Sequence, residues 1–209
     1  VFGEVFQLLD RDKDFLSQYP VKPSEDIKKY LLDELGDNIE NYLEIKIPDN
    51  MFIWATMNSA DQGVFPIDTA FKRRWDFTYL GIDEGENNIK NYDFFLGDNK
   101  DKINWNLLRK AINNELLLHN INEDKLLGPH FISKDSLKDD ETFINVFKNK
   151  VIMYLFEDAA KQKRSSVFGG TENPKLYSSI CKEFDKKGVA IFSEGISKNF
   201  ITNQIGDDE

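Results

Sequence analysis

Apolar residues run almost without interruption through Met51–Thr56, and polar residues follow them at once. A continuous apolar run of this length is typical of a strand buried on both faces, as in parallel α/β sheets, where ligands lie beyond the carboxyl ends of the strands. The run leads into Met57-Asn-Ser-Ala-Asp61. We therefore expect a central strand that presents Asn58 and Asp61 at a polar site.

Further elements of an α/β unit surround this run. Residues 43–47 alternate apolar and charged side chains, which predicts a half-exposed strand near the sheet edge, and residues 75–80 alternate in the same way. Asp68 can cap a short helix over residues 69–74. The first part of the chain is thus predicted to contain a strand, loop, helix and strand in that order.

Helix signals precede these strands. Residues 1–10 carry apolar side chains at helical spacing, and the chain begins within this pattern without an initiator methionine, so we expect it to be part of a longer protein. Ser24 is a candidate N-cap, with acidic residues in the following turn, and Gly36 is a candidate stop. These signals predict a short helix between Ser24 and Gly36.

The second part of the chain is predicted to be helical. Residues 83–88 are acidic and typical of a loop, and beyond them only residues 189–192 resemble a buried strand. Helical periods cover residues 103–118 and 144–158, and a third helix is predicted to begin at Asn173-Pro174 and to end at Gly188. We expect an α/β domain over residues 1–82 and an all-helical domain over residues 83–209.

Charge and composition exclude several functions. The net charge is −10 and the sequence pI is about 4.8, so this segment repels a nucleic-acid backbone. Cys181 is the single cysteine, and His119 and His130 lack the spacing of a metal pair, so no metal site is predicted. No apolar run reaches the roughly 18–20 residues that cross a bilayer. A cytoplasmic protein without membrane contact is expected.

Four short motifs together resemble the McrB family of AAA+ nucleotidases, the motor subunits of restriction systems that attack modified DNA. They are Phe2-Gly-Glu4, Met57-Asn-Ser-Ala-Asp61, Phe71-Lys-Arg-Arg-Trp75 and Leu127-Gly-Pro-His-Phe131, and the similarity extends to about residue 170. The resemblance implies the distal part of an AAA+ P-loop nucleotidase core, followed by a helical lid subdomain. It also implies a sensor strand and an arginine-finger helix within the core.

The resemblance and the chemistry of an amide point to Asn58 as a nucleotide sensor. Its side chain can donate to a γ-phosphate oxygen and accept from the attacking water. The alternative is that Asn58 ends a strand through a local turn. Asp61 either helps to organise the site or contacts a partner. The alternative is that it caps a loop or forms a salt bridge with Arg73 or Arg74.

Two arginines and one lysine complete the candidate site. Arg73 and Arg74 fit arginine fingers, because a planar and permanently charged fork can stabilise the phosphoryl oxygens at a neighbouring subunit. The alternative is a basic helix end that complements the helix dipole, which needs only one cation, so the pair can divide the two roles. Lys125 is either a second sensor of the nucleotide or a solvated lysine.

The sequence departs from the family pattern in two respects. Gln62 stands where the family has arginine, and the chain contains neither G-x-x-x-x-G-K-[ST] nor an Asp-Glu pair at the end of an early apolar strand. The phosphate cradle and the magnesium carboxylates are therefore expected upstream, and this chain alone is not expected to bind a cofactor or hydrolyse nucleotide. The full-length protein is expected to use GTP or ATP with Mg²⁺.

The resemblance also implies partners. They are a homo-oligomeric ring, a nuclease subunit, and DNA bound through a separate domain outside this chain. Two other interpretations stay open at this point. One is an AAA+ remodelling motor whose client is a protein, and the other is a non-catalytic interaction module that only assembles with partners.

Overall fold

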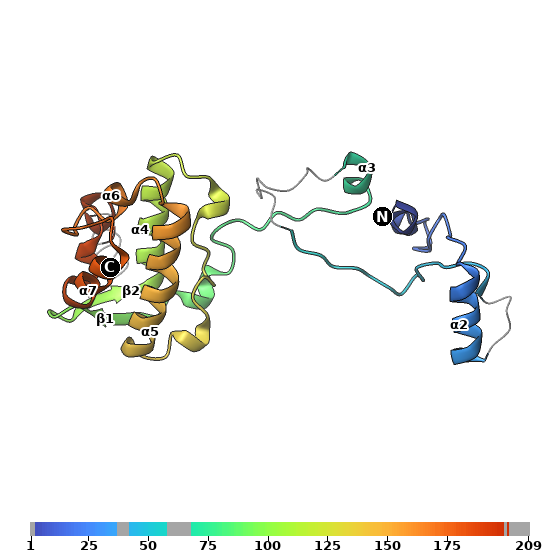
Figure 1. The fold of residues 1–209 in the computed structure, drawn as a ribbon, viewed down its shortest axis with the longest axis horizontal. Coiled ribbons are helices and arrows are strands. Elements are labelled where there is room, and N and C mark those ends of the chain that lie inside the picture. Colours follow the sequence, from blue (N-terminus) through green and yellow to red (C-terminus); the bar gives the residue numbers. More distant parts are fainter. Residues whose placement is uncertain (1–2, 37–41, 58–67, 199, 201–209) are drawn as a thin grey trace. The chain divides into compact units, whose positions relative to one another are not determined.

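The computed structural model describes residues 3–36, 42–57, 68–198 and 200. The chain divides into two compact units, Val1–Tyr79 and Leu80–Glu209, which are considered separately below (Figure 1). That these units are part of an AAA+ core and its lid stays a prediction.

The helices of the first unit are short, and two of them begin after the predicted N-caps, but the helix predicted over residues 69–74 ends at Lys72. Helix α1 (Gly3–Phe6) continues as a 3₁₀ turn over Gln7–Leu9. Helix α2 (Glu25–Leu35) begins after Ser24, whose Oγ accepts a hydrogen bond from the Ile27 N–H, and ends at Gly36, where φ is +63°. Helix α3 (Thr69–Lys72) is capped by the Asp68 carboxylate. The predicted caps are therefore confirmed.

The strands predicted for the first unit are absent from its described residues. Residues 51–57 form no strand and expose their side chains, with Trp54 93% exposed. Residues 43–47 contribute only an isolated antiparallel bridge between Ile45 and Val21, and residues 75–80 form no strand. A strand requires neighbouring strands that pair with its N–H and C=O groups, and no strand or bridge pairs with residues 51–57 among the described residues of this unit. The prediction of a buried central strand is wrong for this structure.

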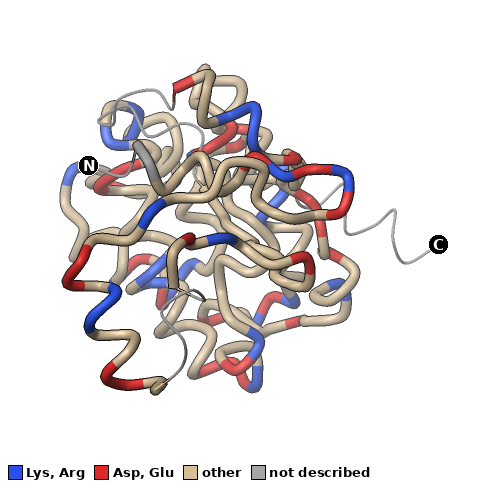
Figure 2. Tube along the Cα trace, turned by 90° about the vertical axis from the view of Figure 1, so that its right-hand side faces the viewer, with Lys and Arg blue, Asp and Glu red and all other residues tan. Residues whose placement is uncertain are grey.

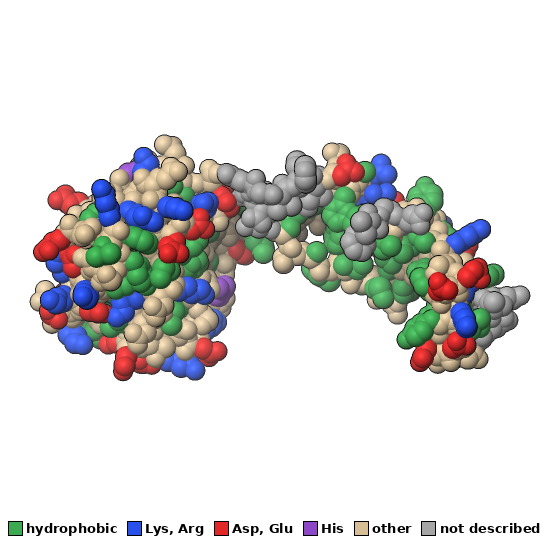
Figure 3. All heavy atoms as spheres, viewed as in Figure 1, with side chains coloured by type: hydrophobic (Ala, Val, Ile, Leu, Met, Phe, Trp, Pro, Cys, Tyr) green, Lys and Arg blue, Asp and Glu red, His purple; other side chains and the backbone are tan. Residues whose placement is uncertain are grey.

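The first unit buries few apolar residues. Leu8 and Pro23 are its buried apolar residues in the described part of the chain. Phe71 of α3 contacts Phe6 with ring centroids 4.7 Å apart, and it contacts Trp75 at 5.6 Å. Exposed hydrophobic side chains are visible over this unit in Figure 3. The described residues thus hold together a small aromatic cluster rather than a closed core.

The second unit contains an unpredicted hairpin, which follows a 3₁₀ turn over Glu86–Ile89. Strands β1 (Asp93–Leu96) and β2 (Asp101–Asn104) pair antiparallel, with Phe94 opposite Ile103. Ile103 fits the helical period of the following residues but lies in β2. Helix α4 (Trp105–Leu118) begins after Asn104, whose Oδ1 accepts from the Leu107 N–H at 3.1 Å. The expectation of an all-helical second part is corrected by this hairpin.

A continuous helix over residues 140–159 follows, as the period at 144–158 predicts. It comprises α5 (Asp140–Val146), a π-helical segment over Phe147–Ile152, and a second one over Leu155–Ala159. The Asp139 carboxylate caps its start by accepting from the Thr142 N–H at 2.8 Å. The π-helical turns widen the helix between its two ends.

The chain then forms α6 (Arg164–Val167) and α7 (Tyr177–Lys187). Helix α7 ends at Gly188, as predicted, but begins at Tyr177 rather than directly after Asn173-Pro174. Gly188 has φ of +54° and begins a 3₁₀ turn over Gly188–Ile191, so the strand considered for residues 189–192 does not form.

Aromatic residues from several elements of the second unit form its core. The Phe94 ring of β1 stacks on Phe143 at 3.8 Å, and Phe147 stacks on Phe184 of α7 at 4.9 Å. Trp105 of α4 contacts both Phe143 and Phe147 edge to face and is fully buried. The hairpin, α4, the helix over residues 140–159 and α7 are therefore held around one hydrophobic core.

Acidic and basic residues are interspersed along the trace of the chain (Figure 2). Among the residues that the structure describes, no helix is long and apolar enough to cross a membrane.

Candidate functional site

Asn58, Asp61 and Gln62 lie outside the described residues. Their proposed place at the end of a strand stays a prediction, and the preceding residues 51–57 form no strand in this structure.

Arg74 is held within the first unit by two hydrogen bonds and an ion pair. Its Nε and Nη2 atoms lie 2.9 and 2.8 Å from Oδ2 of Asp10, and Nη1 donates to the Ala70 carbonyl at 2.8 Å. Both charged side chains are mostly buried, with exposed fractions of 14% for Arg74 and 20% for Asp10. The fork also satisfies a carbonyl that the short helix α3 leaves unpaired. Arg74 therefore stabilises the attachment of α3 to the segment that follows α1.

Arg73 is placed differently from its neighbour. It is the C-cap residue of α3, and its backbone N–H donates to the carbonyls of Phe71 and Thr69. Its side chain is exposed, and no hydrogen bond or ion pair joins its guanidinium to another residue that the structure describes. The structure thus separates the two arginines of the motif, and Arg73 is the one whose five donors are available to a ligand or a partner.

Arg11 was not predicted as a site residue, yet it fixes the start of the apolar run. Its Nε donates to the Phe15 carbonyl at 2.7 Å, and Nη2 donates to the carbonyls of Pro48 and Met51 at 2.8 and 2.9 Å. Arg11 directly follows Asp10, the partner of Arg74. Two consecutive residues therefore connect the arginine helix and the beginning of the run that leads toward Asn58.

Lys125 is paired with an acidic residue in the second unit. Its Nζ lies 2.7 Å from Oδ1 of Asp158. This hydrogen bond, with the charges of Asp158 and Asp124, raises the pKa of Lys125 against a smaller opposing effect of burial. The Tyr154 hydroxyl donates to the Lys125 carbonyl at 3.1 Å, and burial raises the pKa of Tyr154 to about 12. Lys125 is thus a charged residue within an ion pair rather than a free cation.

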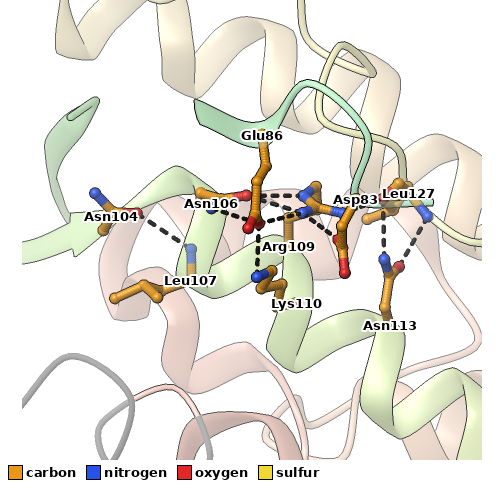
Figure 4. Close-up of polar contacts among 9 residues, drawn as sticks. All are labelled: Asp83, Glu86, Asn104, Asn106, Leu107, Arg109, Lys110, Asn113 and Leu127. Carbon is orange, nitrogen blue, oxygen red and sulfur yellow. Dashed lines mark hydrogen bonds and ion pairs between the residues drawn. The ribbon is translucent and has the colours of Figure 1, made fainter. Parts of the chain in front are cut away.

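Among the described residues, the most buried charged side chain is that of Arg109 in α4, which was not a predicted site residue (Figure 4). Nη2 donates to Oδ1 of Asp83 at 2.6 Å and to Oδ1 of Asn106 at 2.9 Å, and Nε lies 3.2 Å from the same Asn106 oxygen. Nη1 donates to the Leu127 carbonyl at 2.9 Å. The side chain is fully buried, so these bonds form in a medium of low dielectric constant.

Two more ionic groups lie beside Arg109. Lys110 Nζ is 2.6 Å from Oε2 of Glu86, and the same oxygen lies 3.6 Å from Nη2 of Arg109. The hydrogen bond from Lys110 is the main reason why the pKa of Glu86 lies below its ordinary value, and Asn106 and the charge of Arg109 lower it further. Glu86 is therefore ionised at neutral pH.

Asn113, one helical turn after Arg109, hydrogen-bonds to both the N–H and the carbonyl group of Leu127. Its Nδ2 donates to the Leu127 carbonyl at 2.9 Å, and its Oδ1 accepts from the Leu127 N–H at 2.8 Å. Leu127 immediately precedes Gly128 and Pro129 in the motif that resembles the start of the family's lid. A polar pair at i and i+4 on the apolar face of a predicted helix is the signal that could have identified both residues.

Three further titratable residues, His119, His130 and Cys181, lie in the second unit. His119 Nε2 is 3.4 Å from Oε1 of Glu115. The His130 ring lies against the backbone of Gly85. Cys181 is half-buried, which raises the pKa of its thiol. No group of three or more His, Cys, Asp or Glu side chains within the described residues has an arrangement that could hold a metal ion.

Comparison with known proteins identifies a relative among restriction enzymes. The chain is 44% identical over 188 residues to the Type II restriction enzyme BsuMI component YdiS of Bacillus subtilis (strain 168). The match covers 88% of this chain and 51% of the relative, so the chain spans about half the length of the protein it matches. No family model matches the sequence, and no solved structure matches it. The chain is thus similar to a component of a restriction system.

Proposed function

We propose that this chain is the C-terminal part of an AAA+ nucleoside triphosphatase that works in an oligomeric ring and drives DNA restriction by a partner nuclease. The observation that carries the restriction role is the 44% identity to a protein named as one component of a restriction enzyme. A component implies further subunits, which is consistent with a separate nuclease. The triphosphatase activity is supported by the sequence motifs around Asn58 and Arg73.

The different surroundings of Arg73 and Arg74 support different roles for the two residues. Arg74 is bound by Asp10 and the Ala70 carbonyl, whereas Arg73 presents its guanidinium to solvent. In the proposed ring, Arg73 stabilises negative charge on the phosphoryl oxygens of a nucleotide held by the neighbouring subunit. Arg74 positions α3 so that Arg73 is presented correctly. Asn58 orients the attacking water.

The exposed apolar side chains of the first unit support its assignment as part of a larger core. Phe52 and Trp54 expose 67% and 93% of their surface. Such residues are costly to leave in water, since burying a large apolar side chain is worth about 1.5–3 kcal/mol. In the proposed protein, further strands of an AAA+ sheet cover this segment. Residues outside this chain also hold GTP or ATP and Mg²⁺.

The test is steady-state hydrolysis of GTP and ATP by the full-length protein, with the variants Arg73→Ala and Lys72→Ala. An arginine finger contributes about 10³–10⁵ in rate, or roughly 4–7 kcal/mol, so Arg73→Ala should abolish measurable turnover. Lys72→Ala, an exposed neighbouring cation, is the matched control and should hydrolyse nucleotide at the unaltered rate. Sedimentation must show that both variants form the same oligomer. Unaltered turnover in Arg73→Ala would contradict the proposed role.

A second experiment addresses the DNA. Bacteria that carry the full-length gene with its neighbouring nuclease gene are challenged with methylated and unmethylated plasmids. If one of the plasmids fails to transform the bacteria and Arg73→Ala restores its transformation, nucleotide-driven restriction is supported. If the methylated plasmid is the one that fails, restriction depends on the modification. Equal transformation by all strains, together with hydrolysis stimulated by protein, favours a remodelling motor. The absence of both activities favours a non-catalytic interaction module.

A further inference from the structure

Two segments that are distant in sequence meet on the same part of α4. Residues 81–89, which open the second unit, approach α4 through Asp83 and Glu86, and residues 126–131 approach it through Leu127 (Figure 4). Arg109 is the residue that touches both segments, with Nη2 on Asp83 and Nη1 on the Leu127 carbonyl. One guanidinium therefore bridges positions that are 44 residues apart along the chain.

The two segments also lie close to each other at Gly85 and His130. Gly85 has φ of +81°, and a Cβ atom at this position would lie 3.2 Å from Nε2 of His130. The left-handed backbone and the close approach of the His130 ring both favour glycine here. The two segments are thus linked by the hydrogen bonds of the buried arginine and lie close together at Gly85 and His130.

We infer that Arg109 is a positioning residue that joins residues 81–89 and 126–131 into one body, so that a disturbance of the first residues of the second unit reaches Gly128–Phe131. The reason is the energetic cost of a buried charge. When one partner leaves, the guanidinium stays fully buried with fewer acceptors, and the remaining bonds must rearrange to compensate. A planar fork can hold both partners at fixed angles, whereas a lysine carries a single ammonium group and cannot.

This coupling has a consequence that rests on the proposed function. Residues 127–131 resemble the segment that begins the lid of the nucleotidase family, and Asp83 lies three residues after the border of the second unit. A change at that border would then be transmitted to the start of the lid by Arg109, rather than through the intervening hairpin and helix.

Amide hydrogen exchange of the full chain, resolved by residue, tests the coupling. Asp83→Asn keeps the shape of the side chain and removes its charge. We expect exchange about five- to thirtyfold faster both for the Glu84 and Glu86 amides and for those of Leu126, Leu127 and Phe131, because the buried guanidinium loses its closest anion while solvent screens part of that interaction at the half-exposed Asp83. Amides of α7 that exchange through local opening should keep their rate.

Lys110→Gln is the matched control. It removes the 2.6 Å ion pair with the same segment at Glu86 but leaves the bonds from Arg109 to Asp83 and Leu127. It should accelerate exchange only within residues 84–89. Arg109→Lys should reproduce the pattern of Asp83→Asn.

The inference is overturned if Asp83→Asn accelerates exchange in residues 81–89 alone, or if it accelerates all amides of the second unit equally. The first result would show that the segments move independently, and the second would show a general structural role. No nucleotide is needed in this measurement, so its outcome is separate from that of the hydrolysis test.

Discussion

The ion pair between Arg109 and Asp83 makes a quantitative prediction about the stability of the second unit. Asp83→Asn leaves the guanidinium fully buried and without its closest anion, which lies at 2.6 Å. A hydrogen bond to a charged group contributes about 1.5–3 kcal/mol, but the Asp83 side chain is 48% exposed and solvent screens part of the interaction. We therefore expect Asp83→Asn to lower the free energy of unfolding by about 1–2 kcal/mol.

The same substitution should be nearly neutral once the arginine is gone. In an Arg109→Met background no buried charge is left unpaired, and Asp83→Asn should cost less than about 0.5 kcal/mol. The double-mutant cycle should then yield a coupling energy of about 1 kcal/mol. This difference separates the ion pair from any general effect of changing residue 83.

Urea unfolding followed by tryptophan fluorescence measures these values. Trp105 is fully buried in the core of the second unit, so Trp54→Phe and Trp75→Phe in every variant leave it as the single reporter. With a urea m-value of about 2 kcal/mol/M, the Asp83→Asn midpoint should fall by about 0.5–1 M. Equal losses in the two backgrounds would refute the reasoning, because the effect would then not require the buried arginine.

Two further predictions concern pH. Because the hydrogen bond from Lys110 places the pKa of Glu86 below its ordinary value, the pair stabilises the second unit fully above about pH 4.5, and this contribution is lost as pH falls through the folded pKa. Glu86→Gln should therefore flatten the acid limb of stability against pH in urea titrations, whereas the exposed control Glu84→Gln should not. The pKa of Tyr154 is raised to about 12, so the stability that its protonated hydroxyl contributes is fully present below about pH 10. This stability is lost as pH rises through 12. Tyr154→Phe removes the hydrogen bond to the Lys125 carbonyl and should lower the free energy of unfolding by about 1 kcal/mol at pH 7. The substitution should also change the ultraviolet titration of the tyrosines above pH 10, and an unchanged titration would contradict the raised pKa of Tyr154.

Local signals in the sequence predicted the helix ends well. Ser24, Gly36 and Asp68 act through the backbone within a few residues, and each performs the predicted capping role. Gly188 likewise ends α7. Cap chemistry depends on neighbours that are always present in the chain, so it can be inferred without a tertiary structure.

Elements that depend on distant partners could not be predicted in this way. The apolar run at 51–57 satisfies the pattern of a buried strand, but a pattern does not provide the neighbouring strands that would bury it. The short hairpin of β1 and β2 was missed because Ile103 also fits the helical period that continues through α4. The strand conformation of Ile103 depends on pairing with β1, which lies before β2 across a turn.

The candidate site shows the same limit. The motif suggested that Arg73 and Arg74 could have different roles, but their different surroundings are visible only in the structure, since Asp10 lies 64 residues before Arg74. Arg109 was overlooked for a related reason, because its partners Asp83 and Leu127 are 26 and 18 residues away. Asn58 and Asp61 lie outside the described residues, and their roles stay predictions.

The uneven distribution of buried side chains determines what bulk calorimetry of this chain can detect. Unfolding heat capacity arises mainly from apolar surface that becomes exposed, and nearly all of the described surface of this kind belongs to residues 80–200. A calorimetric melting curve of the isolated chain therefore reports mainly the unfolding of the second unit. A substitution such as Arg74→Ala can unfold the first unit with little change in this curve. The arginine motif must be studied by local probes near α3, or in a protein where its apolar neighbours are covered.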